Sequence, residues 1–564
     1  MDENVAMTRL EQEMPWVDGQ TISSVLRKTA ATYPTKEALV FPAINYRISY
    51  QEFDKKVDSV AKGLLALGIS KGDHVAMWAT NIPEWPLLQM ATARIGAVFV
   101  TINPANRSRE LAHVLKQSDV KALFLIDQFK TSNYIEILND VCPELATSAL
   151  GKIESHAFPF LKWVVSVKNT PSAGMLTWDG MMALGESVDI EAVHNIERTL
   201  EPQEPINIQY TSGTTGFPKS AMLSHRNILM NGYYVAGCQN ITENDRMCIP
   251  VPYYHCFGCV MGTLGAITHG ATMVIPAEYF DPEATLLAIE TEKATTIYGV
   301  PTMFIAMLEH KHFSSRNLRS LRSGIMAGSP CPIEIMKRVV NQMGVKEITI
   351  AYGQTETSPV ITQTRINDPI NVRVETVGRP LPGVKVKIID LETGEEVPVG
   401  TQGELCALGH GNMISYYNDF EGTRKAKDEE GWVHTGDLAI QRPDGNYVIT
   451  GRIREMIIRG GENIYPREIE EFLFTHKAIA QVAVFGVPDK KYGEAVAAWV
   501  KLHEEHEKIT SDEIKEYCKG KIAHFKVPKY VQFVEEFPMT VSGKLQKFKM
   551  REAMVEERGL DKEG

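Results

Sequence analysis

Six consecutive hydroxyl-bearing residues and glycines stand near the middle of the chain, in the segment Tyr210-Thr-Ser-Gly-Thr-Thr-Gly-Phe-Pro-Lys219. The glycines allow a sharp turn, and hydroxyl and N–H groups in such a turn can donate hydrogen bonds to phosphate oxygens. A polar surface turn would explain a shorter version of the segment. It lacks the Gly-Lys-Ser/Thr ending of a P-loop GTPase or kinase. The candidate phosphate-binding residues are Thr211, Ser212, Gly213, Thr214, Thr215, Gly216 and Lys219.

Two later segments carry acidic residues that could serve the same ligand. Tyr352-Gly-Gln-Thr-Glu356 places an aromatic ring, a hydroxyl and a carboxylate within five residues, and Trp432-Val-His-Thr-Gly-Asp437 ends in an acid. A carboxylate can accept hydrogen bonds from a pair of hydroxyls. A magnesium ion held mainly by phosphates needs only one or two protein carboxylates. Each segment alone could equally be an ordinary turn, so their chemistry depends on their meeting in space.

A lysine and a histidine are the remaining candidates for catalysis. Lys544 ends the glycine loop Thr540-Val-Ser-Gly-Lys544, and a cation there could neutralise charge that develops on oxygen. Locally it resembles part of a basic surface patch, because Lys547 and Lys549 follow. His255 lies in Pro252-Tyr-Tyr-His-Cys-Phe-Gly258, where it could act as a general base or serve gating and packing. Cys256 and Cys259 lie beside it, but no second pair of cysteines accompanies them at the spacing of a zinc site.

The elements that must position these residues follow a strand–helix alternation. Strand-like apolar runs at 74–79 and 97–101 alternate with amphipathic segments at 85–94 and 109–117, and another apolar run follows at 122–126. This alternation predicts parallel sheets covered by helices.

The residue pattern changes twice after this α/β region. Residues 376–450 are rich in Gly, Pro and short alternating strands such as 384–389, which predicts a β-rich subdomain. Beyond it, short strands mix with charged helices. We therefore expect an α/β fold with a large N-terminal domain, residues 1–451, holding two α/β sheets and the β-rich subdomain. A small α+β C-terminal domain, residues 452–564, should follow.

The bulk properties exclude several classes of protein. The 564 residues carry 59 Lys and Arg against 70 Asp and Glu, a net charge of −11, which argues against nonspecific nucleic-acid binding. A local basic pocket could still hold an anionic small molecule. The chain has eight scattered cysteines, an acidic N-terminal segment and no uninterrupted apolar run of about 20 residues. We expect a cytoplasmic protein without integral membrane association.

Taken in order along the chain, the motifs resemble the adenylate-forming superfamily of acyl-CoA synthetases, peptide-synthetase adenylation domains and beetle luciferases. The similarity extends over residues 20–550. The phrases Tyr-Tyr-His-Cys-Phe-Gly and Met-Ala-Gly-Ser-Pro-Cys-Pro look most like medium-chain fatty acyl-CoA synthetases. The motifs that carry the resemblance are 210–219, 252–258, 327–330, 352–356, 435–437, 451–462 and 542–544.

The resemblance implies an acid–thiol ligase that uses ATP, Mg²⁺ and coenzyme A. A carboxylate attacks the α-phosphorus of ATP to form an acyl-AMP, and the coenzyme A thiol then displaces AMP. By resemblance, Lys544 acts in the first step, Thr355 binds the α-phosphate, and Glu356 holds the metal. His255 borders the acid site and the channel for the thiol.

The nucleotide and coenzyme A contacts are implied in the same way. Asp437 would bind the ribose hydroxyls, and Arg452 would be a second nucleotide contact. Gly460, Gly461 and Glu462 would swing to the active site for the second step and line the pantetheine tunnel. The small domain would therefore be mobile, with its hinge at Arg454, where many relatives carry aspartate. Tyr352 would pack on the adenine, and Gly328, Ser329 and Pro330 would line it; Gly353 and Gln354 would be further cofactor-binding residues.

Other functions stay open on the sequence alone. An aryl-CoA ligase, an acyl-carrier-protein ligase and a luciferase share the motifs, and a catalytically inactive nucleotide binder is an alternative of another class. The joint presence of Glu356, Asp437 and Lys544 argues against the last one. The chain length of the acid and the oligomeric state, for which a homodimer is one candidate, are left open.

Overall fold

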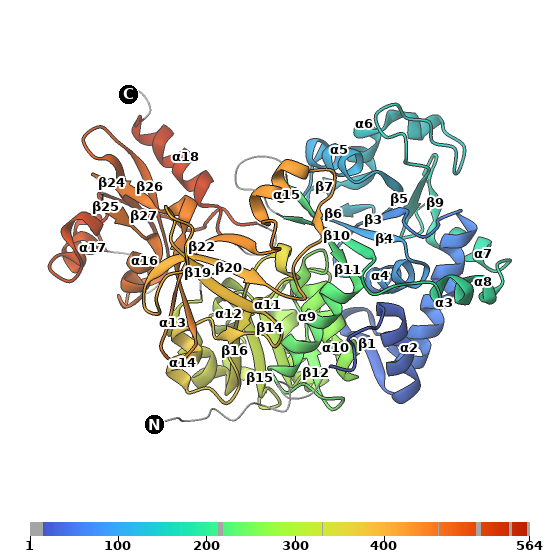
Figure 1. Ribbon diagram of the computed structural model, residues 1–564, viewed down its shortest axis with the longest axis horizontal. Coiled ribbons are helices and arrows are strands. Elements are labelled where there is room, and N and C mark those ends of the chain that lie inside the picture. The colour runs from blue at the N-terminus through green and yellow to red at the C-terminus, as the bar shows by residue number, and fades with distance from the viewer. Residues whose placement is uncertain are drawn as a thin grey trace.

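The computed structural model of the protein describes residues 15–170, 172–211, 218–329, 331–460, 462–503, 509–540 and 544–560 (Figure 1). A large N-terminal domain contains an eight-stranded sheet, a nine-stranded sheet and a four-stranded sheet, and a small C-terminal domain has a sheet of its own. The two largest sheets carry helices, as Figure 1 shows. The expected α/β fold with a small α+β C-terminal domain is confirmed.

The eight-stranded sheet has the order β21-β11-β10-β4-β3-β5-β8-β9. Its central neighbours run parallel, and every residue of β3 and β4 is buried, as a sheet covered on both faces requires. The expected strands at 74–79 and 97–101 thus exist, with slightly different ends. Its strands are β3 His74–Trp78, β4 Val98–Ile102, β5 Val120–Leu125, β8 Trp163–Ser166, β9 Leu176–Thr177, β10 Pro205–Thr211, β11 Lys219–Ser224 and β21 Ser415–Tyr416.

The nine-stranded sheet has the order β18-β17-β16-β15-β14-β12-β13-β1-β2. The run from β16 through β14 and β12 to β13 and β1 is parallel. Its strands are β1 Glu37–Phe41, β2 Tyr46–Ser49, β12 Arg246–Cys248, β13 Thr272–Val274, β14 Thr296–Gly299, β15 Ser323–Ala327, β16 Glu347–Tyr352, β17 Thr362–Gln363 and β18 Arg379–Pro380.

Helices cover both sheets, and α9 and α10 lie between them in Figure 1. Helix α3 illustrates the local cause: Ser49 and Glu52 form a capping box, and apolar side chains recur every three or four residues on the buried face. The helices of the large domain are α2 Ile22–Thr32, α3 Tyr50–Ala66, α4 Glu84–Ile95, α5 Ser108–Gln117, α6 Tyr134–Val141, α7 Trp178–Gly185, α8 Ile190–Glu197, α9 His225–Gly237, α10 Gly265–His269, α11 Pro282–Glu292, α12 Pro301–Leu308, α13 Ile333–Arg338, α14 Ile370–Glu375 and α15 Phe420–Ala426.

The four-stranded sheet is antiparallel and consists of β19 Lys385–Ile389, β20 Gln402–Leu408, β22 Val433–Gln441 and β23 Tyr447–Arg452. It joins the nine-stranded sheet through Gly378, whose carbonyl accepts the Tyr447 N–H at 2.9 Å. Strand β21 leaves this region and pairs with β11 at the edge of the eight-stranded sheet. The β-rich segment therefore connects both larger sheets.

The small domain contacts the large one through a helix, where Arg467 donates to the Ile449 carbonyl at 2.7 Å. Within the small domain, Lys547 pairs with Glu455 at 3.2 Å and with Glu470 at 2.8 Å. Its helices are α16 Pro466–Phe474, α17 Ser511–Cys518 and α18 Lys547–Arg558, and its strands are β24 Ile457–Arg459, β25 Glu462–Ile464, β26 Ile479–Asp489, β27 Gly493–Leu502 and β28 Tyr530–Phe533. No helix in the described ranges has the length and apolar character needed to cross a membrane.

The backbone at Gly378 leads to a stability prediction. Gly378 has φ +78°, and a β-carbon there would lie 2.1 Å from the carbonyl carbon of Gln363. Gly378→Ala should cost about 3 kcal/mol, from the positive φ and the clash together. The control is Gly394, which also has a positive φ but no atom within 4 Å of an added β-carbon. Gly394→Ala should therefore cost only about 1 kcal/mol. Chemical denaturation measures both; equal losses would contradict the steric argument.

Candidate active site

The candidate nucleotide site begins where parallel strands of the nine-stranded sheet end. Gly328 follows β15, and Tyr352 is the last residue of the neighbouring β16. Ligands of open α/β sheets commonly bind at the carboxyl ends of such strands. Gly328 is exposed and has φ +87°, a conformation that favours glycine and leaves the backbone accessible. Ser329, which follows it, is half-buried, and its carbonyl lies 3.4 Å from the Cys331 Sγ.

Thr355 and Glu356 lie in a short 3₁₀ turn, Thr355–Thr357, after β16. Both side chains are about 8–9% exposed. The Glu356 carboxylate accepts a hydrogen bond of 2.5 Å from the Tyr416 hydroxyl, and the Lys219 ammonium lies 4.9 Å above the Tyr416 ring. Tyr416 therefore connects the predicted metal-binding acid to the end of the phosphate loop.

Gly353 and Gln354 shape the same turn. A β-carbon on Gly353 would lie 2.2 Å from the Pro359 carbonyl oxygen, so the chain approaches itself closely there. Gln354 caps the 3₁₀ turn, with its N–H donating to the Thr357 hydroxyl at 3.2 Å. These contacts give both residues a role in holding Thr355 and Glu356 in place.

Asp437 joins the site from β22 of the four-stranded sheet. Its carboxylate accepts a hydrogen bond of 2.8 Å from the Tyr352 hydroxyl and lies 3.1 Å from Arg452 Nε. Arg452 is opposite Asp437 on the antiparallel neighbour β23. Burial raises the pKa of Asp437, while Arg452 and Tyr352 act in the opposite direction. The three residues form one polar group beside the end of β16.

Lys544 enters from the small domain. Its Cε lies 3.8 Å from the position that a β-carbon on Gly328 would take, and its backbone N–H donates to the Thr540 hydroxyl at 3.0 Å. Burial, followed by the charge of Arg452, lowers the pKa of Lys544 to about 8, although Glu356 and Asp437 oppose the shift. The lysine thus stands among the predicted nucleotide residues.

His255 borders this group of residues. Its Nδ1 accepts the Phe257 N–H at 3.2 Å, which leaves Nε2 to carry the proton of the neutral ring. Burial and the nearby Lys544 lower the pKa of His255 to about 3. The imidazole is therefore neutral at physiological pH. The π-helix Phe257–Leu264 that follows is fully buried, so it fixes the histidine on a rigid element.

The two ends of the predicted phosphate loop lie side by side, because β10 and β11 pair with Thr211 opposite Lys219. Thr211 is half-buried and Lys219 is exposed. The remaining predicted residues of this loop, and two from other motifs, lie outside the described residues: Ser212, Gly213, Thr214, Thr215, Gly216, Pro330 and Gly461.

The predicted coenzyme A loop is not beside Lys544 in this structure. Gly460 has φ +62° and its N–H donates to the Tyr492 carbonyl at 2.7 Å; Glu462 is the first residue of β25. Figure 1 shows β24 and β25 on the side of the small domain that faces away from the large domain. The predicted hinge residue Arg454 lies between β23 and β24 and is exposed.

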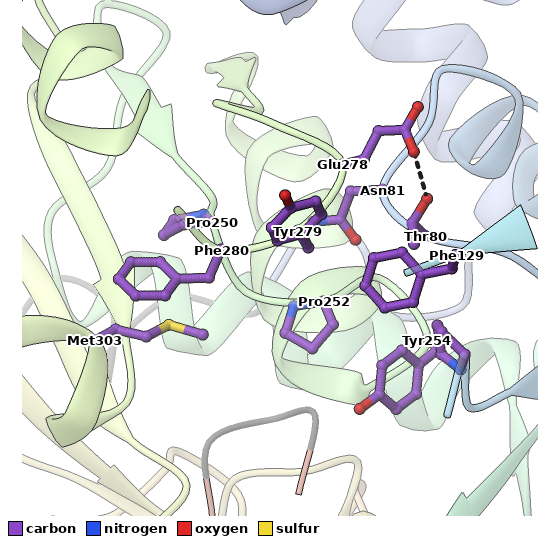
Figure 2. Close-up of a pocket in the computed structure, with 11 residues that line it drawn as sticks. Thr80, Asn81, Phe129, Pro250, Pro252, Tyr254, Glu278, Tyr279, Phe280 and Met303 are labelled. Atoms are coloured by element: carbon purple, nitrogen blue, oxygen red, sulfur yellow. Dashed lines mark hydrogen bonds between the residues drawn. The ribbon is translucent and has the colours of Figure 1, made fainter. Parts of the chain in front are cut away.

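A cavity of about 570 Å³ lies between the two domains. Arg107, Lys130 and Lys501 contribute basic side chains to it, and Thr540 of the Lys544 loop also lines it. A smaller cavity of about 30 Å³ shares Phe129, Phe280 and other lining residues with it. Figure 2 shows this smaller cavity surrounded by aromatic rings, prolines and Met303. At its edge the Thr80 hydroxyl donates a hydrogen bond of 3.1 Å to the Glu278 carboxylate.

Tyr416 is a site residue that the sequence analysis missed. It lies in a two-residue strand far from any of the quoted motifs, and it reaches Glu356 only because β21 pairs with β11. Nothing in its immediate sequence signals this contact. The pairing of sheet edges decides it.

The chain belongs to the AMP-binding enzyme family. The model of the AMP-binding enzyme family matches residues 26–417, and that of the AMP-binding enzyme C-terminal domain matches residues 468–544. This confirms the resemblance seen in the sequence.

Individual relatives agree with this family. The Bacillus subtilis (strain 168) protein YngI, named as an acyl-CoA synthetase, is 51% identical over 95% of this chain and 97% of its own. The medium-chain acyl-CoA ligase ACSF2, mitochondrial, of Danio rerio is 43% identical over 96% of this chain and 90% of its own. A solved Mycobacterium tuberculosis fatty acyl CoA synthetase has 26% identity and a TM-score of 0.70, covering 94% of this chain and 98% of that one.

The hydrogen bond between Tyr352 and Asp437 yields a binding prediction. Tyr352→Phe keeps the aromatic ring and removes the donor to the carboxylate, which should weaken AMP binding about tenfold, or about 1.4 kcal/mol. Calorimetric titration with AMP measures the affinity. Tyr447→Phe is the control and should bind normally: Tyr447 lies on β23 of the four-stranded sheet that carries Asp437, and its hydroxyl is 3.5 Å from the Val386 carbonyl. Equal affinities in all three proteins would refute the role of this bond.

Proposed function

We propose that the protein is an ATP-dependent acid–thiol ligase that converts a fatty acid, of medium chain length, to its acyl-CoA through an acyl-AMP, releasing pyrophosphate and AMP. The observation that carries this proposal is the position of Lys544. A lysine from a separate domain stands beside Gly328 and the Tyr352–Asp437–Arg452 group. Membership of the AMP-binding family and the names of the relatives support the same reaction.

In the proposed first step, a carboxylate oxygen of the acid bonds to the α-phosphorus of ATP and the bond to pyrophosphate breaks. Negative charge grows on the phosphate oxygens, so a positioned cation lowers the barrier. We assign this role to the Lys544 ammonium, with Thr355 as an α-phosphate contact. Thr211 and Lys219, with the loop between them, would hold the outer phosphates.

The nucleoside would lie across the ends of β15 and β16. Tyr352 offers a ring face for the adenine, and the exposed backbone at Gly328 permits a close approach. Asp437 would accept hydrogen bonds from the ribose hydroxyls, and Arg452 would add a further nucleotide contact while holding the Asp437 carboxylate. Gly353 and Gln354 would support the turn that carries Thr355.

Glu356 fits a magnesium ion. Its carboxylate is nearly buried and accepts a hydrogen bond from Tyr416, which leaves lone pairs for an oxygen-preferring cation. When bound, Mg²⁺ neutralises charge on the phosphates. Tyr416 holds the carboxylate in its orientation.

In the proposed second step the coenzyme A sulfur bonds to the acyl carbon and AMP leaves. The interdomain cavity is suited to the anionic coenzyme, because Arg107, Lys130 and Lys501 line it. We propose that the small domain then turns about Arg454, which would bring Gly460 and Glu462 toward the thiol. His255, whose imidazole is neutral, would border both the acyl group and the thiol.

The assignment of a fatty acid rests on the relatives, whose names include a medium-chain acyl-CoA ligase and a fatty acyl CoA synthetase. Each methylene contributes only about 0.8 kcal/mol of burial, so neighbouring chain lengths should differ only modestly in rate. We also propose a cytoplasmic location. All eight cysteines, each a described residue, are thiols rather than disulfides, as expected in a reducing compartment.

A panel of acids tests the reaction. Pyrophosphate release with ATP, magnesium and coenzyme A should be greatest with octanoate and decanoate, lower with acetate and palmitate, and weakest with benzoate. Lys544→Ala should reduce the rate on the order of 10²–10³, because a charge contact in the transition state is lost. Full activity in the variant would remove Lys544 from the mechanism, and activity with benzoate alone would replace the fatty acid by an aromatic one.

The lowered pKa of Lys544 predicts a pH profile. Its ammonium loses the proton as the pH rises through about 8, so kcat/KM for acyl-AMP formation should fall above that pH. Lys544→Arg should be slower but lack this alkaline limb, because a guanidinium keeps its charge throughout. Pyrophosphate-exchange rates across pH measure both. An unchanged alkaline limb in the arginine variant would assign it to another group.

A further inference from the structure

Three side chains with different metal-binding atoms meet on one face of the four-stranded sheet. Cys406 on β20 is paired with His434 on the antiparallel strand β22. Glu404 is two residues from Cys406, and side chains two apart on a strand point to the same face. A thiol, an imidazole and a carboxylate are thereby gathered from two neighbouring strands.

The spacing of these atoms suits a small cation. His434 Nδ1 lies 3.5 Å from the Cys406 Sγ and 3.1 Å from Glu404 Oε2, and all three atoms lie within 4.8 Å of one another. Zinc–ligand bonds of about 2.0–2.3 Å in a tetrahedral arrangement place neighbouring ligand atoms about 3.3–3.8 Å apart. Only small shifts of the side chains would complete this geometry.

The surroundings orient the same atoms. Asp428 Oδ2 lies 3.6 Å from His434 Nε2, the ring nitrogen that points away from the other two groups. The other oxygen of Glu404, Oε1, accepts the Gly436 N–H at 2.9 Å. Metal-ligating histidines and carboxylates typically have such partners on the atom that does not bind the metal.

We propose that Glu404, Cys406 and His434 form a binding site for a thiophilic divalent cation of the Zn²⁺ type. Three protein ligands leave a fourth position for water, and the exposed fractions of the Glu404 and His434 side chains, 14% and 30%, give access from solvent. A thiol and an imidazole prefer Zn²⁺ to Mg²⁺. The site is separate from Glu356 and takes a different cation.

Binding exchanges a proton for the metal. A cysteine binds such a cation as the thiolate, so the proton of the Cys406 thiol must leave. The S–H bond breaks, the S–Zn bond forms, and the proton passes to solvent. Lys387 is opposite Cys406 on β19, with its ammonium 4.3 Å above the Trp432 ring, and the carboxylates of Glu404 and Asp428 offset its charge.

The site is connected to the segment that presents Asp437. Gly436, which donates to Glu404, immediately precedes Asp437, and the Thr435 hydroxyl donates to the Leu405 carbonyl at 2.7 Å. A bound cation would hold Glu404 and His434 on either side of this segment. It would therefore stabilise the loop that carries a nucleotide-binding acid.

Cobalt substitution tests the proposal on the full-length protein. Titration with Co²⁺ should produce a near-ultraviolet thiolate-to-metal charge-transfer band that saturates at one equivalent and that Zn²⁺ abolishes. Cys406→Ser should remove the band, and His434→Gln should weaken Co²⁺ binding at least tenfold. Cys518→Ser, which removes another buried thiol, is the matched control and should keep both the band and the affinity. An unchanged band in Cys406→Ser, or none in the unaltered protein, would overturn the proposal.

A second histidine cluster needs its own control. Glu283, His310 and His312 also lie close together, but Glu283 is engaged by Arg316 as well. The double variant His310→Ala/His312→Ala should retain the cobalt band.

Zinc binding gives a second readout. Zn²⁺ should release about one proton per metal and raise the unfolding temperature of the unaltered protein, and the double variant should still show the proton release. Cys406→Ser, checked by circular dichroism to be folded, should show neither effect; if it shows both, the metal binds elsewhere.

Discussion

The arrangement of the candidate site depends on holding one ammonium group, that of Lys544, partly out of water next to two buried acids. Desolvation makes a charge costly, and it also makes its interaction with another charge stronger. The lysine pKa of about 8 records this balance, since Arg452 and burial favour loss of the proton while Glu356 and Asp437 favour its retention. The site is consequently sensitive to any change in the position of the small domain.

Contacts within the small domain and with the large one keep the lysine in place. Lys547, three residues after Lys544, pairs with Glu455 and with Glu470 on α16, both in the small domain. Arg467 donates to the Ile449 carbonyl of β23. The small domain also has hydrophobic clusters of its own. A domain with its own core can stay folded while it changes position, which the proposed second step requires.

Much of the fold was accessible from local sequence patterns. The apolar runs at 74–79 and 97–101 became β3 and β4, and the amphipathic segment at 85–94 lies within α4, because periodicity and burial act over a few residues. The candidate site was accessible mainly through the family resemblance. Asp437 and Lys544 look locally like a turn and a basic patch, and only their joint presence with the other motifs marked them.

The sequence by itself indicated the alternation of strands and helices, a reducing environment for the cysteines and the residue types available for catalysis, since these depend on composition and short-range spacing. The tertiary structure decided which groups meet. Tyr416 reaches Glu356 through the pairing of β21 with β11, and His434 reaches Cys406 through the register of β22 on β20. The pKa values of Lys544 and His255 were decided in the same way, because burial and neighbouring charge come from segments far apart in the chain.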